Sequence, residues 1–315
     1  MNVVVAGGAG FIGSHLVERL ISDGHHVVAV DNLVTGRLSN LQSVVKHERF
    51  RFVEHDICRP MALQGPVDLV LHLASPASPS DFLRIPLEIL EVGSTGTRQM
   101  LELAVEHDAR FLFASTSEVY GDPMVHPQPE TYLGNVDSIG PRGCYDESKR
   151  FGEALTMAYR RTRAVDSVIV RIFNTYGPRM RPDDGRVLST FITQALRGEP
   201  LTVHGDGSQT RSYCYVDDLV DGILAAATSG GAGPYNLGST RELSVLDLAH
   251  AVVRATGSSS VVVTTPLPPE RSGDPQRRQP DLTRTTAECD WRPTTTLDDG
   301  VLRMVDAIRA ELEHR

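Results

Sequence analysis

The chain has 315 residues, of which 40% are hydrophobic and 23% are charged, and its formal net charge is −9. This size suits one large domain with a smaller lobe, and the acidic balance argues against a nucleic-acid or anionic-membrane partner. The apolar run "NVVVAGG" begins at Asn2, and no stretch approaches the ~18 apolar residues of a membrane span, so we expect a cytoplasmic protein with a small-molecule substrate.

The first half of the chain alternates short apolar runs with segments of helical periodicity. Apolar strands separated by helices are typical of a parallel sheet that is covered on both faces. We therefore predict an α/β fold, with a Rossmann-type doubly wound parallel sheet and a smaller, discontinuous C-terminal substrate domain. Strands are expected at 3–6, 25–31, 50–56, 67–74, 110–116 and 165–174, and helices at 11–24, 87–108 and 145–163.

The character of the sequence changes after Asn174. Loops rich in Gly, Pro and Asp break up shorter elements there, which is typical of a smaller lobe built from discontinuous pieces. The stretch "YCYVDDLVDGILAAA" predicts a strand and a helix that return to the first domain. We assign residues 1–174 and 212–230 to the first domain, and residues 175–211 and 231–315 to the second.

The stretch "GGAGFIG" follows the first predicted strand and opens the first predicted helix. Gly7, Gly10 and Gly13 lack Cβ atoms, so the turn can be tight and a pyrophosphate can approach the N–H groups at the positive end of the helix. Asp31 ends the second strand 18 residues beyond Gly13, where a carboxylate can accept hydrogen bonds from an adenosine ribose. The pattern predicts a site for NAD rather than NADP, because a carboxylate repels the 2′-phosphate, although Arg37 lies near enough in sequence to accommodate that phosphate.

Further cofactor contacts are expected from the loops that follow the predicted strands. Residues around the glycine turn, after Asp31, at the end of the third strand and in "HLASP" would lie along a bound dinucleotide. The predicted contacts are Phe11, Ile12, Asn32, Gly36, Asp56, Ile57, Leu73, Ala74 and Ser75.

The segment "YDESK" places Tyr145 and Lys149 at positions i and i+4, so on a helix both side chains point the same way. Lys149 is one of only two lysines among 31 lysine and arginine residues, which favours a specific use of its ammonium. An adjacent ammonium and a positively charged nicotinamide favour the phenolate of Tyr145, which can then act as a base. The hydroxyl of Thr116, at the end of "RFLFAST", completes a site for alcohol oxidation. Tyr145 and Lys149 are also expected to contact the nicotinamide end of the cofactor.

Several longer segments add to these motifs, among them "ASTSEVYGDPMVHPQPE", "RIFNTYGPRM" and "DPQRRQPD". Together they resemble the extended short-chain dehydrogenase/reductases that act on nucleotide sugars, and within that family the UDP-glucuronate decarboxylases, also called UDP-xylose synthases. Related dehydratases have Asp-Glu after the threonine, whereas this chain has Ser117 and Glu118, which favours decarboxylation over dehydration. The resemblance covers nearly the whole chain and implies that the first domain binds NAD and the second binds a UDP-sugar.

The resemblance implies a reaction on UDP-glucuronate without net redox change. C4 of the glucuronate ring is oxidised by bound NAD, the 4-keto acid loses CO₂, C5 is protonated, and C4 is reduced again to give UDP-xylose. No metal is needed for these steps. In this comparison Thr116, Tyr145 and Lys149 serve the oxidation, while Ser117 and Glu118 face the substrate, with Glu118 acting on its carboxylate.

The late basic segment is expected to supply a further catalytic residue. In the resemblance, Arg278 takes the position of a catalytic arginine that can bind a carboxylate, and Arg271 and Arg277 are close enough in sequence to compete for that assignment. Arg271 and Arg278 are therefore both expected to contact the substrate. The contacts expected for the nucleotide end of the substrate are Asn174, Arg186, Val187 and Arg211.

Two other functions remain open from the sequence. A UDP-sugar 4-epimerase shares the oxidation at C4 but releases no CO₂. A non-catalytic NAD-binding protein of the same fold would bind the cofactor and turn over no nucleotide sugar.

The expected partners are the substrate, the cofactor and a second copy of the chain. The four cysteines are scattered without a C-x-x-C pair, so the sequence predicts neither a zinc site nor a disulfide framework. The resemblance implies a homodimer, with the helices near 87–107 and 145–163 forming the interface.

Overall fold

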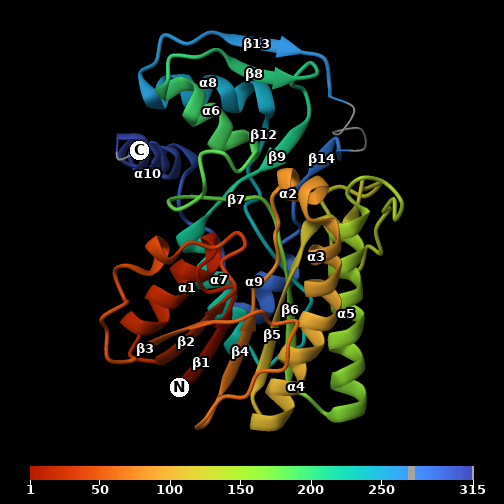
Figure 1. Ribbon diagram of the computed structural model, residues 1–315. Helices are drawn as coiled ribbons and strands as arrows, with labels where there is room; N and C mark the ends of the chain where they lie inside the picture. Colours follow the sequence, from red (N-terminus) through yellow and green to blue (C-terminus); the bar gives the residue numbers. More distant parts are fainter. Residues whose placement is uncertain (269–273, 314–315) are drawn as a thin grey trace.

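A seven-stranded parallel sheet forms the larger part of the molecule, with the strand order β3-β2-β1-β4-β5-β6-β11 (Figure 1). The computed structural model describes residues 1–268 and 274–313. The chain starts in the middle of the sheet, builds one half outward and then crosses over to build the other half, so the predicted doubly wound α/β fold is confirmed. The strands are β1 (Asn2–Ala6), β2 (His26–Asp31), β3 (Phe50–Glu54), β4 (Leu69–His72), β5 (Arg110–Thr116), β6 (Ser167–Ile172) and β11 (Tyr235–Leu237).

The two faces of the sheet are buried in two separate hydrophobic cores. Side chains alternate along β1, so Val3 and Val5 pack in one core, whereas Val4 and Ala6 pack in the other. The first core is covered by α1 (Phe11–Ser22), α7 (Val216–Thr228) and α9 (Thr283–Cys289), and the second by α4 (Thr97–His107) and α5 (Gly143–Arg163), with α3 (Pro86–Glu91) against α5.

Among the described residues, no helix has both the length and the apolar character needed to cross a membrane.

The segment expected as one helix at 87–108 consists of α3, a π-helical turn at Val92–Gly96, and α4. The turn lies against α5. A Cβ atom on Gly93 would lie 2.4 Å from the Cβ of Ser148, so only glycine allows this close approach. The π-helical turn therefore sits directly beside the part of α5 that carries Lys149, the next residue after Ser148.

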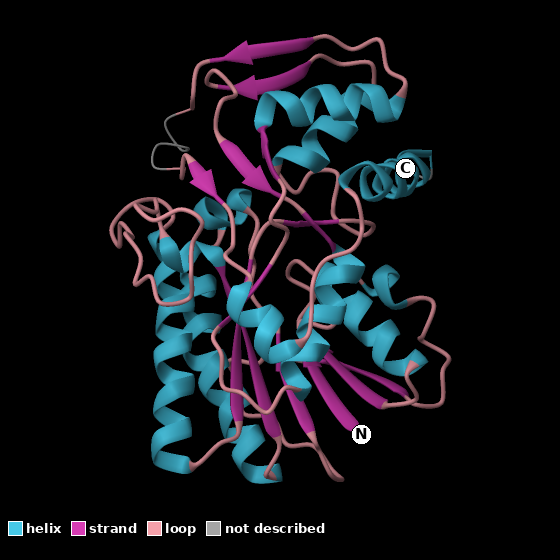
Figure 2. Cartoon of the chain, turned by 180° about the vertical axis from the view of Figure 1, so that it is seen from behind, coloured by secondary structure: helices cyan, strands magenta, loops and turns pink. Residues whose placement is uncertain are grey.

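A smaller lobe with its own hydrophobic core lies above the sheet (Figure 2). Its helices α6 and α8 pack together, and the strand pair β8–β13 covers them at the end of the molecule remote from the sheet. A three-stranded sheet, β12-β9-β14, connects this lobe to the late segment of the chain. The elements are α6 (Val187–Leu196), β8 (Leu201–His204), β9 (Thr210–Ser212), β12 (Glu242–Ser244), α8 (Val245–Thr256), β13 (Val262–Thr265), β14 (Arg277–Arg278) and α10 (Leu297–Glu313), with β7 (Thr175–Tyr176) and β10 (Cys214–Tyr215) at the junction.

The boundaries of the two parts differ from those expected for residues 231–315. β11 pairs with β6 and extends the large sheet, and α9 packs on β11 and α7. Trp291 lies in the same core as the sheet and is only 5% exposed. The short strand β11 escaped the sequence argument because it has only three residues and follows a glycine-rich turn. We retain the division into two domains as a proposal, with 235–237 and 283–291 moved to the first.

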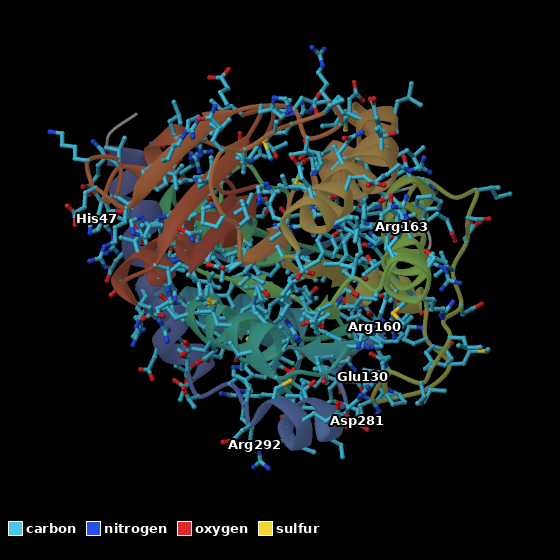
Figure 3. All side chains as sticks on the ribbon, turned by 90° about the horizontal axis from the view of Figure 1, so that it is seen from below. His47, Glu130, Arg160, Arg163, Asp281 and Arg292 are labelled. Carbon is cyan, nitrogen blue, oxygen red and sulfur yellow. The ribbon has the colours of Figure 1, made fainter. Side chains whose placement is uncertain are left out.

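The late segment of the chain is held against the loop that follows β5. Gln128 N donates to Gln279 O over 2.9 Å, and Asp281 N donates to Gln128 O over 2.9 Å. Glu130 accepts a hydrogen bond from Asn236 N at 2.9 Å, and Figure 3 shows Glu130 and Asp281 near each other. This anchoring brings the residues before Gln279 to the carboxyl end of β5.

Candidate active site

A cavity of about 440 Å³ lies between the carboxyl ends of the large sheet and the smaller lobe. Its wall contains residues that follow β1, β4, β5 and β6, together with residues of α6, β8 and β14. This is the place where doubly wound sheets bind ligands. Eight basic and five acidic side chains line it, although the chain as a whole has a net charge of −9, so the cavity suits an anionic ligand.

The glycine turn after β1 forms a backbone cradle at the cavity. Gly7 has a φ of +81°, and a Cβ on it would lie 2.7 Å from Ala74 N. A Cβ on Gly13 would lie 2.0 Å from Gly7 O. Helix α1 begins with Gly10 as its N-cap, and no side chain caps its first N–H groups. A pyrophosphate fits this cradle, because its oxygens can accept hydrogen bonds from those N–H groups. Cβ atoms on the glycines would obstruct its approach.

Asp31 ends β2 beside the glycine turn. Its carboxylate accepts hydrogen bonds from Ala9 N at 3.0 Å and from Leu33 N at 2.8 Å, and burial raises its pKa. The neighbouring Arg37 donates to Glu311 of α10 over 2.7 Å. Since this contact engages Arg37 with a carboxylate, the arrangement favours NAD over NADP.

The structure brings together most of the residues expected from the sequence. Six expected residues do not line the cavity: Asp31, Asn32, Gly36, Asp56, Ile57 and Ala74. Of these, Ile57 is packed in a core of the large sheet and Ala74 lies against it. Those that line the cavity are Gly7, Gly10, Phe11, Ile12, Gly13, Leu73, Ser75, Thr116, Ser117, Glu118, Tyr145, Lys149, Asn174, Arg186, Val187, Arg211 and Arg278.

Tyr145 and Lys149 occupy one face of α5 and both line the cavity, as their spacing predicts. Lys149 Nζ donates to Ala114 O over 2.9 Å and lies 5.8 Å from the centre of the Tyr145 ring. The ring of Tyr145 stacks on Phe82 with centroids 4.9 Å apart. Thr116 ends β5, and its hydroxyl accepts a hydrogen bond from Glu118 N at 3.2 Å. The end of β5 thus orients the threonine near α5.

The acid–base properties of this pair differ from the sequence argument. Burial and the charge of Glu118 raise the pKa of Tyr145 to about 12, although a hydrogen bond with Thr116 opposes the shift. Burial lowers the pKa of Lys149 to about 7. The apolar surroundings of the two side chains outweigh their mutual effect, so the protein alone does not favour the phenolate.

Glu118 is held between two arginines. Its Oε1 accepts a hydrogen bond from Arg278 Nη1, and its Oε2 accepts one from Arg142 Nη2. Burial disfavours the carboxylate, but Arg278 and Arg142 together lower the pKa of Glu118 to about 2. The Nε atom of Arg278 is buried and has no hydrogen-bond partner among the described residues. This donor is available to an acceptor in the cavity.

The structure separates the three late arginines. Arg277 and Arg278 are consecutive residues of β14 and so point to opposite sides of the strand. Arg277 is exposed, whereas Arg278 is 3% exposed and lines the cavity. Arg271 lies outside the described residues. Of the two arginines that the structure describes, Arg278 is the one placed to contact a substrate.

The arginines expected for a nucleotide also line the cavity. Arg186 pairs with Asp184 at 3.0 Å and donates to Ala77 O over 2.7 Å. Arg211 donates to the carbonyl oxygens of Thr210 and Gln276. These contacts orient both guanidiniums along the cavity, where they can bind a diphosphate.

The charged group around Arg142, which includes Asp274 and Asp146, was not expected from the sequence. Arg142 and Asp274 line the cavity and form an ion pair of 2.8 Å. Asp146 is 5% exposed, and burial and the charge of Glu118 raise its pKa to about 7. Arg142 could have been found from its position three residues before Tyr145, which places it at the start of the catalytic helix. The contact of Arg142 with Asp274 depends on the tertiary fold.

Comparison with known proteins shows the family of this chain. The model of the NAD dependent epimerase/dehydratase family matches residues 3–238. UDP-glucuronic acid decarboxylase 1 of Xenopus tropicalis is 46% identical over 314 residues, covering 100% of this chain and 73% of that protein. UDP-glucuronic acid decarboxylase 1 of Arabidopsis thaliana is 47% identical over 309 residues, covering 98% of this chain and 70% of that protein.

A solved structure resembles this chain over nearly its whole length. The UDP-glucuronic acid 4-epimerase of Bacillus cereus, in complex with UDP-glucuronic acid and NAD, is 30% identical and covers 99% of this chain and 100% of that chain. Its TM-score is 0.87. From the match over residues 3–238 and the identity over the whole chain, we conclude that this chain belongs to the NAD dependent epimerase/dehydratase family.

Proposed function

We propose that this protein is a UDP-glucuronate decarboxylase that uses tightly held NAD and produces UDP-xylose and CO₂. The observation that carries this proposal is Glu118, ionised between Arg142 and Arg278 on the cavity wall beside Tyr145. A site for a neutral hexose needs no such group of charges, whereas a uronic acid brings a carboxylate that a buried arginine can bind. The curated relatives, at 46% and 47% identity, are UDP-glucuronic acid decarboxylases.

The cofactor is NAD, placed with its pyrophosphate on the cradle of Gly7, Gly10 and Gly13 and its adenosine toward Asp31. When bound, it accepts the hydride from C4 of the sugar and later returns it. Tyr145 takes the proton of the C4 hydroxyl, and Thr116 positions that hydroxyl by a hydrogen bond. Lys149 stabilises the phenolate once positive charge is present in the pocket.

Loss of CO₂ follows from the new ketone at C4. The bond between C5 and the carboxylate breaks, and its electron pair delocalises toward the ketone oxygen as an enolate. Arg278 orients the departing carboxylate through its free Nε donor, and Glu118 and Ser117 line the same wall. C5 of the enolate then takes a proton that comes from solvent water, which restores the ketone. Tyr145 returns its proton to the C4 oxygen as this ketone is reduced.

A UDP-glucuronate 4-epimerase is the second candidate, because the solved epimerase binds UDP-glucuronic acid in a similar fold. Incubation of the purified protein with UDP-glucuronate and NAD, followed by mass spectrometry of the nucleotide, separates the two. The decarboxylase gives UDP-xylose and one CO₂ per substrate. An epimerase gives an isomer of unchanged mass, and a non-catalytic protein gives no product.

A homodimer is part of the proposal. Large apolar side chains are exposed on α2 (Pro79–Arg84), α3 and α5: Leu83 is 60% exposed, Leu87 74%, Leu90 40% and Phe151 46%. Helices α3 and α5 pack side by side (Figure 1), so these residues form an apolar surface that a second copy can cover. Light scattering at micromolar concentration measures the mass and tests this interface. A cytoplasmic location is proposed from the sequence alone and is tested by cell fractionation.

A further inference from the structure

Arg142 lies immediately before α5, three residues from Tyr145, and the reaction described above assigns it no step. Its guanidinium has two carboxylate partners on two different segments. Nη2 donates to Glu118 Oε2, and Nη1 donates to Asp274 Oδ1 over 2.8 Å. Its Cζ also lies 5.6 Å from the centre of the Phe82 ring. The side chain is 17% exposed, so these contacts hold it on several sides.

The contacts of Arg142 connect the catalytic helix with the late segment of the chain. Asp274 and Arg278 belong to that segment, and both are tied to Glu118: Arg278 directly, and Asp274 through Arg142. Each oxygen of Glu118 therefore has one arginine donor. Two donors from opposite sides fix the orientation of a carboxylate more strictly than one does.

We propose that Arg142 is a positioning residue, which fixes the Glu118 carboxylate and thereby the pairing of Glu118 with Arg278. It acts on the reaction through these two groups and does not touch the reacting atoms. This inference rests on the decarboxylase function proposed above. It predicts that replacing Arg142 lowers the turnover rate by the amount that the positioning of Glu118 contributes. NAD binding at the glycine turn should be preserved.

The charges around Glu118 allow a direct test of this role. Arg278 faces it from β14, Arg211 from β9, and Arg142, Tyr145 and Asp146 from the start of α5. Removal of Arg142 takes away one of the two cations that lower the pKa of Glu118. Its titration must then move to higher pH, which a general loss of stability does not produce.

The test uses full-length protein with five changes: Arg142→Met, Arg142→Lys, Asp274→Asn, Glu118→Gln, and the double variant E118Q/R142M. NMR of protein labelled with ¹³Cδ-glutamate follows the Glu118 carboxyl, with Glu118→Gln identifying its signal. We expect Glu118 to remain ionised at mildly acidic pH in the wild type and to titrate on the order of one pH unit higher in Arg142→Met. In Asp274→Asn, which keeps the contact of Arg142 with Glu118, the titration should stay close to that of the wild type.

Kinetics with UDP-glucuronate supply the second measurement. We expect kcat to fall roughly 10²-fold in Arg142→Met, with KM and the Kd for NAD changed less than about threefold. E118Q/R142M should be no more than about twofold slower than Glu118→Gln alone, because both changes remove the same positioning. If Arg142→Met does not fold, Arg142→Lys serves in its place, since an ammonium cannot bridge the two carboxylates as a guanidinium fork does.

Independent, multiplicative losses in the double variant overturn the proposal. So does an unchanged Glu118 titration in Arg142→Met, or an equal shift in Asp274→Asn. The proposed function fails separately, when the wild-type protein releases no CO₂ from UDP-glucuronate. In that case the NMR titration still decides whether Arg142 positions Glu118.

Discussion

Arg278 and Glu118 form a buried ion pair across the cavity, although 160 residues separate them in the chain. Glu118 stands at the carboxyl end of β5, and Arg278 arrives on β14 after the chain has passed through most of the smaller lobe. The hydrogen bonds between Gln128 and Gln279 hold the two segments together next to this pair. The pair therefore links the carboxyl end of the large sheet to the late segment of the chain.

Replacing Arg278 should reduce decarboxylation much more than replacing its neighbour. Arg278→Met removes the buried guanidinium of a residue that lines the cavity, and we expect kcat to fall by about 10²–10³-fold, the usual effect of losing one aligned charged donor. Arg277→Met is the matched control, because Arg277 is exposed and on the other side of β14. CO₂ release measured on both variants checks this, and equal losses would show that Arg278 has no special role.

Tyr145→Phe should abolish turnover and spare cofactor binding. The change removes one oxygen, and with it the proton acceptor, while the ring can still stack on Phe82. We expect kcat to fall by about 10²–10⁴-fold. Calorimetry should give a Kd for NAD within about twofold of the wild type. Retained activity would reject the role of Tyr145 as the base.

Asp146→Asn should make the stability of the protein less dependent on pH. Burial and Glu118 raise the pKa of Asp146 to about 7, above its ordinary value of 3.8. Between these two values the folded protein holds a proton that the unfolded chain has lost, so stability falls as pH rises toward 7. Asparagine cannot ionise, and the Tm of the variant relative to wild type should increase from pH 5 to pH 8.

Glu147→Gln is the control for this change. Glu147 is the next residue on α5, and its side chain is 39% exposed and pairs with Arg150. Its replacement should leave the pH dependence of Tm close to that of the wild type. Parallel Tm curves for Asp146→Asn and the wild type would contradict the assignment of a buried, proton-holding Asp146.

Asp31→Asn should weaken the preference for NAD over NADP. The carboxylate repels a 2′-phosphate. Asparagine removes this charge and keeps one acceptor oxygen, so one of the two hydrogen bonds from Ala9 N and Leu33 N remains. We expect the ratio of the two Kd values to fall by about tenfold, as measured by calorimetry, which corresponds to about 1.4 kcal/mol. Asp56→Asn, at the end of β3, should leave the ratio nearly unchanged. An unchanged ratio in Asp31→Asn would argue that the carboxylate does not set the preference.

Leu87→Glu should convert the proposed homodimer to monomers. Leu87 is 74% exposed on α3, and a charge in the middle of a buried apolar interface costs several kcal/mol. Val261→Glu, at a residue that is 61% exposed in the smaller lobe, is the control and should keep the dimer mass. Light scattering distinguishes the two, and a monomeric wild type would rule out the interface.

The sequence by itself determined the features that depend on local chemistry. The glycines after β1, the carboxylate after β2 and the tyrosine and lysine one turn apart on α5 each have a spacing that fixes their relative positions within one element or one turn. Alternating apolar strands and helices similarly fixed the doubly wound sheet, because strands buried on both faces must be apolar throughout.

Only the tertiary structure decided the features that depend on contacts between distant segments. β11 joined the large sheet because its partner is β6, some sixty residues earlier in the chain. Strand alternation at β14 selected Arg278 over Arg277, and the fold brought Asp274 and Glu118 to Arg142. Burial also raised the pKa of Tyr145 and lowered the pKa of Lys149, since desolvation depends on everything packed around a side chain and not on its neighbours in sequence.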